Sequence, residues 1–302
     1  MSAKIYRLLT ILIILLGAIG IGGIGLSLIT RHLQTQQTQQ IQQANDLLAQ
    51  KKYDSALAAY DRLLETQKLQ PYRLWTNRGY ALLGLKRYRE ALESCTTAAS
   101  FQPKADLAWN CRGEALYYLD RQDDALTAFK RAIALNPRNP TFQLNQGRVL
   151  TDLSQHEKAI EVLSKAISQL ESESQTPQNK NNLAIALNDL GQSLLVQQQN
   201  KRALAAFERS LTYQPEFLSA QQGLGVALYR LGRYQQAIEI FNKILQQPGL
   251  TPEQQAIGWL YKGISLCQTP QATAATEAFA KVLQLTDNPQ LNKIAQAGCG
   301  IR

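Results

Sequence analysis

Residues 109–137 read WNCRGEALYYLDRQDDALTAFKRAIALNP and hold the pattern that decides the fold. Two apolar segments with helical periodicity flank the charged turn LDRQDD, and a proline follows the second segment. The same stretch contains a Cys, a Glu, two Tyr and three Asp residues, a mixture that is also typical of a reactive site. A structural unit is expected to recur along the chain, whereas a catalytic site is not, so the rest of the sequence decides between them.

The spacing of this stretch recurs seven times along the chain. Each unit has a small residue, which we call the anchor, in the middle of its first helical segment. A Leu follows three residues after every anchor, an Ala follows after twelve, and a large or apolar residue follows after sixteen. The anchors are Ala44, Gly79, Gly113, Gly147, Gly191, Gly225 and Gly263, at spacings of 35, 34, 34, 44, 34 and 38 residues. A repeat of this length predicts stacked pairs of helices.

The residue types at the repeated positions have a mechanical explanation. The small Gly and Ala positions are expected where two helices cross closely, because a larger side chain there would overpack the crossing. Three units carry Trp four residues before the anchor, and three carry Pro twenty-four residues after it, where the second helix must end. One pair of helices cannot bury its apolar face alone, so we expect the pairs to stack.

The succession W-x3-G-x2-L, A-x3-F and P at a 34-residue period resembles the tetratricopeptide repeat family over about residues 41–287. The resemblance implies an all-α fold, an α-solenoid in which about seven helix pairs form a right-handed superhelix. It implies that the first helix of each pair lines a concave groove. It also implies that this groove binds peptides or other proteins and that the chain is not an enzyme.

The expected organisation has four parts. Residues 1–7 form a cytoplasmic N-terminus, residues 8–30 a transmembrane anchor, residues 31–40 a Gln-rich linker and residues 41–302 the repeat array. The linker is either a flexible tether or a helical extension of the membrane segment. We place the repeats at about 41–70, 72–105, 106–139, 140–175, 180–217, 218–250 and 254–287, with a capping helix at 288–298.

One interval between anchors is ten residues longer than the period, from Gly147 to Gly191. It contains LESESQTPQNKNN at residues 170–182. This insertion predicts that the flanking helices are extended around a loop at Thr176-Pro177. It also predicts that the array divides there into a block of four units and a block of three.

The N-terminal run LLTILIILLGAIGIGGIGLSLIT, Leu8–Thr30, carries no charge. A helix of this length crosses a hydrocarbon layer of ~30 Å. A cleaved signal peptide is the alternative, although its apolar region is usually shorter. Lys4 and Arg7 precede the run, so the positive-inside rule places the array on the extracytoplasmic side, periplasmic or lumenal. Pairs of small residues that would let two such helices dimerise are Ala18/Gly22 and Gly23/Ser27.

Several function classes are disfavoured by composition. The chain has two His residues: His32 borders the apolar run, and His156 occupies an interhelical turn. Catalysis through a nucleophile and a His is therefore excluded. No Gly-rich phosphate loop occurs, and we expect no cofactor and no metal site. The net charge is +9, but the densest basic cluster, KRYR at residues 86–89, spans one helical turn. Nucleic-acid binding is therefore disfavoured.

The four Cys residues, 95, 111, 267 and 299, show no metal-binding spacing. They are expected as small buried hydrophobic residues. In an oxidising compartment, a bridge between Cys95 and Cys111 is the first pairing to consider.

The groove implied by the resemblance is lined by the residue after each anchor and by those two, three and six before it. The candidate groove residues are Asn45, Asn77, Tyr80, Asn110, Glu114, Tyr117, Arg148, Asn188 and Tyr229. Some family members clamp a C-terminal carboxylate with cationic side chains. Here Asn45 and Asn77 match that clamp, whereas its cationic positions are Ile41, Leu107 and Cys111, which disfavours it.

The residue after the anchor is apolar only in the last two units, Val226 and Ile264. Either the groove becomes apolar towards its end, or these residues contact the capping helix. The function expected from the whole sequence is a membrane-anchored scaffold or adaptor that binds a protein partner, in the assembly of a membrane or envelope complex. The alternatives are a basic surface that binds RNA or anionic lipid in a salt-sensitive way, and a substrate-presenting arm of an enzyme complex.

Overall fold

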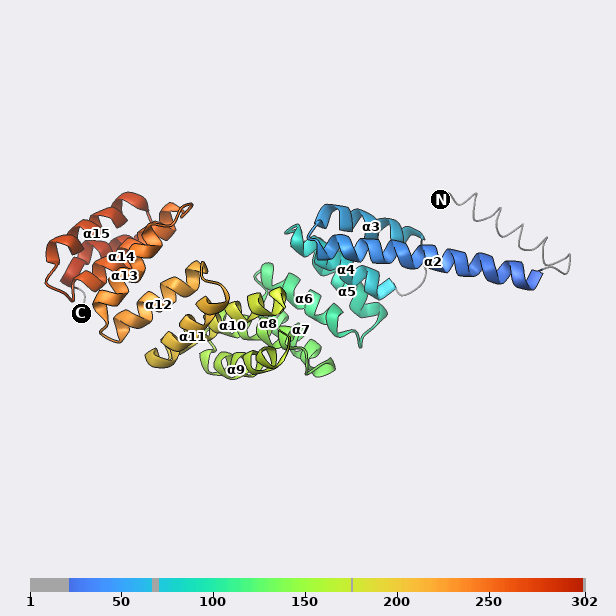
Figure 1. The fold of residues 1–302 in the computed structure, drawn as a ribbon, viewed down its shortest axis with the longest axis horizontal. Helices are drawn as coiled ribbons and strands as arrows, with labels where there is room; N and C mark the ends of the chain where they lie inside the picture. Colours follow the sequence, from blue (N-terminus) through green and yellow to red (C-terminus); the bar gives the residue numbers. More distant parts are fainter. Residues whose placement is uncertain (1–21, 67–70, 175, 301–302) are drawn as a thin grey trace. The chain divides into compact units, whose positions relative to one another are not determined.

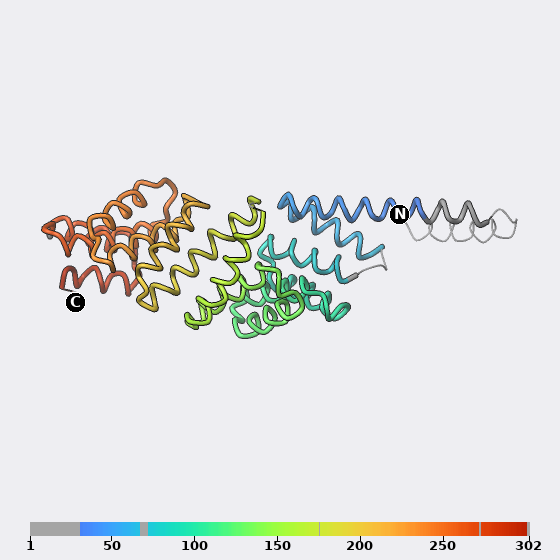
Figure 2. The backbone as a smooth tube through the Cα atoms, turned by 60° about the horizontal axis from the view of Figure 1, so that its bottom comes forward, coloured from blue at the N-terminus to red at the C-terminus, as the bar shows by residue number. Residues whose placement is uncertain are grey.

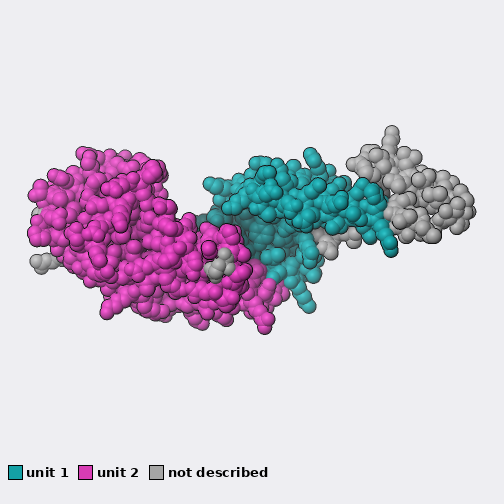
Figure 3. All heavy atoms as spheres, viewed as in Figure 1, with its two compact units in different colours: residues 1–120 teal, residues 121–302 magenta. Residues whose placement is uncertain are grey.

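The computed structural model describes residues 22–66, 71–174 and 176–300 (Figure 1). All regular secondary structure in these ranges is helical. The chain divides into two compact units, with the boundary in the sequence between Asp120 and Arg121 (Figure 3). Within each unit, consecutive helices run back and forth beside one another (Figure 2). The predicted all-α fold of stacked helix pairs is therefore confirmed within each unit.

The first unit consists of five described helices. The paired helices α2 and α3 contact each other, as do α4 and α5, and α6 packs against both α4 and α5. The helices span Gly22–Ala49 (α2), Tyr53–Thr66 (α3), Pro71–Gly84 (α4), Tyr88–Phe101 (α5) and Asp106–Tyr118 (α6).

The second unit contains α7, four complete pairs and the C-terminal cap. Its helices span Gln122–Leu135 (α7), Pro140–Asp152 (α8), His156–Ser172 (α9), Pro177–Val196 (α10), Asn200–Tyr213 (α11), Leu218–Arg230 (α12), Tyr234–Leu245 (α13), Pro252–Leu266 (α14), Ala272–Leu285 (α15) and Pro289–Ala297 (α16), followed by the 3-10 helix η1 at Gly298–Gly300. The contacts α8·α9, α10·α11, α12·α13 and α14·α15 join the two helices of a pair.

The ten-residue insertion lengthens two helices, as its sequence predicts. Helix α9 has 17 residues and α10 has 20, and Thr176 caps α10 by accepting a hydrogen bond from the Asn179 amide at 3.1 Å. The prediction that the array divides at Thr176-Pro177 is wrong, because the boundary of the compact units lies between Asp120 and Arg121. The physical reason is that the extra residues are helical and α9 still packs against α10.

The core consists of the repeated positions. The Ala twelve residues after the anchor is fully buried in all seven repeats. The residue four positions later is at most 4% exposed in each. The small anchors are required by contact. A Cβ atom on Gly147 would lie 2.5 Å from Leu163 Cδ2, and one on Gly225 would lie 2.5 Å from Phe241 Cζ. The predicted close crossings are confirmed at these positions.

The turn between the two helices of a repeat has the same backbone form in six of the seven repeats. The residue seven positions after the anchor has a positive φ in each, and five of the six are not glycine: Lys51, Lys86, Asp120, Ser154, Gln198 and Gly232. In five of these six turns the amide that follows it donates to the carbonyl five residues earlier, as Lys52 N does to Leu47 O at 2.9 Å. In the seventh unit Pro270 occupies this position, and since proline cannot adopt a positive φ, the turn there is longer, from residue 267 to 271.

Two cysteine pairs join helices within the units. Cys95 on α5 is bonded to fully buried Cys111 on α6, with the Cα atoms 5.7 Å apart. Cys267, which follows α14, is bonded to Cys299 in η1, with the Cα atoms 5.3 Å apart. The first pairing is the one that the sequence puts first, whereas the second is not anticipated. The expectation that all four are unpaired hydrophobic residues is wrong.

Much of the apolar run at residues 8–30 lies outside the described residues, as do residues 1–7 and Ala18. From Gly22 onward the run forms the start of α2, and the Gln-rich segment at 31–40 continues that helix. In the ranges that the structure describes, no helix combines the length and the apolarity needed to cross a membrane.

Candidate partner-binding groove

Every predicted groove residue lies on the first helix of its pair. Asn45 lies on α2, and Asn77 and Tyr80 lie on α4. The remaining positions are Asn110, Glu114 and Tyr117 on α6, Arg148 on α8, Asn188 on α10 and Tyr229 on α12. The side chains do not form one site. They fall into three polar clusters, two in the first unit and one in the second, with Tyr229 apart from them.

The first cluster links α2 to α4. Asn77 donates from Nδ2 to Asn45 Oδ1 at 2.9 Å, and the hydroxyl of Tyr60 donates to the same oxygen at 2.9 Å. Tyr60 is fully buried, and burial raises the pKa of its hydroxyl to about 12. The two Asn side chains that match the carboxylate clamp are therefore bonded to each other, across the step from one first helix to the next.

The second cluster links α4 to α6. The Tyr80 hydroxyl donates to Leu107 O at 3.2 Å and accepts from Asn110 Nδ2 at 3.0 Å. Asn110 is only 2% exposed and also donates to Glu114 Oε1 at 2.5 Å. Burial, with the nearby Glu114 carboxylate, raises the pKa of Tyr80, so its phenol stays neutral. The cluster offers a neutral hydroxyl and a carboxylate beside each other.

The aromatic neighbours of this cluster lie at the end of α6. Tyr117 meets Tyr118 edge to face, with ring centroids 5.3 Å apart. Tyr118 is exposed and stacks on Tyr88 of α5 at 4.8 Å. The predicted groove residue Tyr117 is thus part of a row of three tyrosines.

The third cluster links α8 to α10 and contains a residue that the sequence reasoning missed. Arg148 Nε lies 3.7 Å from Asp189 Oδ2, and Asn188 Nδ2 donates to Asp189 Oδ1 at 3.1 Å. Burial raises the pKa of Asp189 to about 6, against the opposing effect of the Arg148 charge. A signal for Asp189 exists, because it is the only charged residue two positions before an anchor, a position that the resemblance places in the groove.

Tyr229 and the apolar positions behave differently from these clusters. Tyr229 packs against Tyr234 of α13, with ring centroids 5.6 Å apart, and burial raises the pKa of its hydroxyl. Ile264 packs into the C-terminal apolar cluster with Leu291 and Ile294 of the capping helix. For Ile264, contact with the capping helix stays a prediction.

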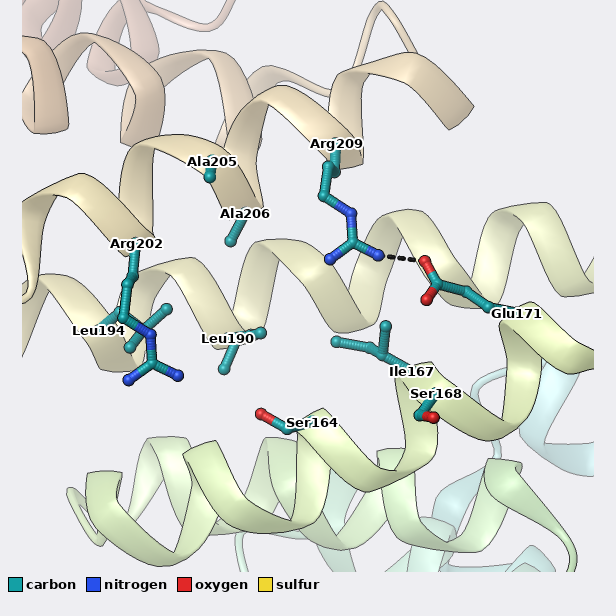
Figure 4. Close-up of a pocket in the computed structure, with 10 residues that line it drawn as sticks. All are labelled: Ser164, Ile167, Ser168, Glu171, Leu190, Leu194, Arg202, Ala205, Ala206 and Arg209. Carbon is teal, nitrogen blue, oxygen red and sulfur yellow. Dashed lines mark hydrogen bonds and ion pairs between the residues drawn. The ribbon is translucent and has the colours of Figure 1, made fainter.

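A hollow that the sequence reasoning missed lies between α9, α10 and α11 (Figure 4). Its volume is about 320 Å³, and Arg202 and Arg209 of α11 stand over an apolar floor. No group of three or more His, Cys, Asp or Glu side chains that could hold a metal ion occurs within residues 22–66, 71–174 and 176–300. The chemistry that these sites offer is hydrogen bonding and charge pairing.

Comparison with known proteins gives a family match over most of the array. A model of the tetratricopeptide repeat matches residues 41–106, 112–175 and 188–254. No curated protein matches the chain.

Many solved structures are similar to this chain. PilW, a widely conserved type IV pilus biogenesis factor, is 26% identical, with 75% of this chain and 97% of that chain covered and a TM-score of 0.61. The Cut9–Hcn1 hetero-tetramer of the APC/C is 16% identical, with 84% of this chain covered and a TM-score of 0.67, but this chain spans only 47% of that one. YrrB, a TPR protein with an unusual peptide-binding site, is 18% identical, with 68% and 98% covered and a TM-score of 0.54.

Proposed function

Since this chain belongs to the tetratricopeptide repeat family, whose fold commonly mediates protein–protein interaction, we propose that it is a membrane-anchored scaffold for a protein partner. It binds an extended peptide segment of that partner along its first helices. The role that we propose is the assembly of a membrane or envelope complex.

One observation carries the proposal: polar side chains connect α2 to α4 and α4 to α6 in the first unit, and α8 to α10 and α10 to α12 in the second. Asn77 bonds to Asn45 and Asn110 to Tyr80 in the first unit. In the second unit Arg148 pairs with Asp189, Thr151 Oγ1 lies 3.1 Å from Ser193 Oγ, and Gln192 Nε2 donates to Ser219 Oγ at 3.1 Å.

These rows of amides, hydroxyls and charges suit a peptide backbone. Amide side chains carry two donors and an acceptor with two lone pairs, so one bond to a neighbour does not exhaust them. A peptide presents an N–H and a C=O at every residue except proline. The buried positions of the second helices are instead mostly Ala, Leu and Phe. The polar rows therefore distinguish the first-helix side as the side that recognises a partner.

Similar proteins support the class of partner and the setting. YrrB has a peptide-binding site on the same fold. PilW, at 26% identity, is a type IV pilus biogenesis factor. These likenesses favour a peptide-binding role in an assembly process.

Membrane anchoring and compartment rest on the chain itself. The uncharged run Leu8–Thr30 is long enough to span a bilayer, and the charges of Lys4 and Arg7 favour a cytoplasmic N-terminus. The pairs Cys95–Cys111 and Cys267–Cys299 support an oxidising compartment for the array, because disulfides are rare in the cytosol. Protease protection in intact cells, with the array resistant until the outer barrier is opened, is the result that agrees with this placement.

The groove is tested by recovering partners from membranes with the full chain. The variant N77A/Y80F/R148A removes one polar group from each of the three clusters. We expect at least one co-purifying protein to fall about tenfold, since losing a charge-assisted hydrogen bond alone has an effect of this size. The matched control K130A/K165A removes exposed charge from second helices and should leave recovery unchanged. If the two variants recover the same partners in the same amounts, the groove is not the binding site.

A further inference from the structure

The hollow between α9, α10 and α11 is a groove with two walls and a floor. One wall is a stripe of α9 at helical spacing, Ser164, Ile167, Ser168 and Glu171. The other is a stripe of α11 at the same spacing, Arg202, Ala205, Ala206 and Arg209. Leu190 and Leu194 of α10 form the floor. The small Ser and Ala side chains leave the space between the two helices open, with a volume of about 320 Å³.

Comparison with the other units shows why the groove opens here. At the position fourteen residues after the anchor, four other repeats carry a carboxylate: Glu93, Glu161, Glu239 and Glu277. The repeat formed by α10 and α11 has Ala205 at this position. Seventeen residues after the anchor, the wall helix α9 has Ser164 where the units on either side have Lys130 and Glu208.

The insertion supplies the end of the groove. Twenty-four residues after the anchor, three units have the Pro that follows the end of their second helix, but α9 continues and places Glu171 there. Glu171 forms an ion pair with Arg209 across the groove (Figure 4). The lengthened helix therefore closes one end with a fixed pair of charges.

Arg202 stands at the other end of the groove with its charge uncompensated. Its guanidinium donates to the neutral Gln199 Oε1 at 2.5 Å. Among the residues that the structure describes, no carboxylate forms an ion pair with Arg202. The lining as a whole carries two Arg and one Glu, so one positive charge is in excess beside an apolar floor. A ligand that complements this groove has an apolar group next to an anion.

We propose that this groove is a second binding site, which takes an acidic peptide segment of a protein partner. An apolar side chain of the segment packs on Leu190 and Leu194, and a neighbouring carboxylate pairs with Arg202. Two helical stripes that flank an apolar floor form the kind of groove that anchors a peptide through its side chains. The volume lies at the lower end of the range for ligand pockets, which suits one or two side chains better than a whole cofactor.

This site is separate from the first-helix clusters. No residue of α8 lines the groove, whereas the nearest cluster joins Arg148 of α8 to Asp189 of α10. Leu190 is the next residue along α10, and it points about 100° away around the helix from Asp189. The two sites can therefore be tested independently, and either can fail without the other.

The test measures binding of a short fluorescein-labelled peptide of Leu and Glu to the full chain, kept in detergent micelles, by fluorescence anisotropy. Two peptides of equal length serve as comparisons, one with Lys in place of Glu and one with Ser in place of Leu. We expect saturable binding of the Leu-Glu peptide alone, in the millimolar range or tighter. Raising the salt concentration should weaken it, because the charge pairing is exposed.

Two exposed substitutions on α11 decide the question. R202E reverses the free charge, and A205E restores the Glu that four other units carry. Both should weaken binding about tenfold or more, because each places a carboxylate against the acidic peptide. K201E makes the same charge change one residue away, outside the groove, and should leave the affinity as in the wild type. Thermal unfolding by circular dichroism verifies that the variants fold. Absence of saturable binding to the folded wild type, or wild-type affinity in folded R202E and A205E, would overturn the proposal.

Discussion

Removing the Cys267–Cys299 bridge is predicted to release the C-terminal cap. The bridge encloses α15 and α16, between cysteines 32 positions apart in sequence. The cap itself is weakly held by other means. Helix α16 has nine residues, of which only Ala295 is buried, while Leu291 and Ile294 pack partly buried against the last pair. A helix of this length is not stable on its own in water.

The magnitude follows from the length of the closed loop. In the chain-entropy model, cross-linking residues at this separation removes loop-closure entropy from the unfolded chain that corresponds to about 3.7 kcal/mol at 25 °C. For Cys95–Cys111, at a separation of 16, the same model gives about 3.1 kcal/mol. In a repeat array each unit contacts only its neighbours, so the loss should be confined to the helices beside each bridge.

The assay combines urea unfolding with amide hydrogen exchange on C267A/C299A and C95A/C111A. In the first variant we expect faster exchange in residues 289–300, with smaller effects in α14 and α15, and no change in α4 and α5. In the second variant the affected helices should be α4, α5 and α6. If C267A/C299A exchanges in residues 289–300 at the wild-type rate and unfolds at the same urea concentration, the bridge does not hold the cap and the reasoning is refuted.

Two further predictions concern the core and the third cluster. G225V should cost about 1–3 kcal/mol in the free energy of unfolding, because its side chain meets Phe241 at 2.5 Å; A205V, exposed on α11, is the control, and equal stability of the two variants would contradict the packing argument. The pKa of Asp189 is about 6 in the folded chain, against a value near 4 in the unfolded chain. As the pH rises, the Asp189 carboxyl therefore loses its proton in the unfolded chain first. Asp189 therefore lowers stability as the pH rises from about 4 through 6, by roughly 3 kcal/mol in total. D189N should remove this slope in urea unfolding series over that range, and an unaltered slope would mean that another group titrates.

The repeat positions could be predicted from the sequence because each is fixed by one close contact within a helix pair. Gly147 must be small because it packs against Leu163, which follows it by sixteen residues and lies on the partner helix. The same spacing between the anchor and this residue recurs in every repeat. The same logic holds at Gly79, where a Cβ atom would clash with Cys95 Sγ, sixteen residues later on the partner helix α5. Local spacing therefore contains enough information to place the core, the turns and the first-helix side.

The features that escaped prediction depend on side chains from more than one helix pair or on segments outside the repeat. Arg202 faces an open groove only because Ala205 is small and α9 is long. Asp189 titrates abnormally because of burial, which a sequence pattern does not measure. Cys299 lies beyond the last repeat, so no periodicity relates it to Cys267.

The recurring left-handed turn residue has a consequence for how such an array can be adapted to heat. A residue with a side chain costs about 1–2 kcal/mol in this conformation, and five of the six turns accept that cost with Lys, Asp, Ser or Gln. Only the sixth uses glycine, at Gly232. Each turn lies in a different repeat, so exchanges to Gly or Asn can be made and measured one repeat at a time. The five turns without glycine are thus positions at which the stability of the array to heat can be raised one repeat at a time. These changes leave both proposed binding surfaces unaltered.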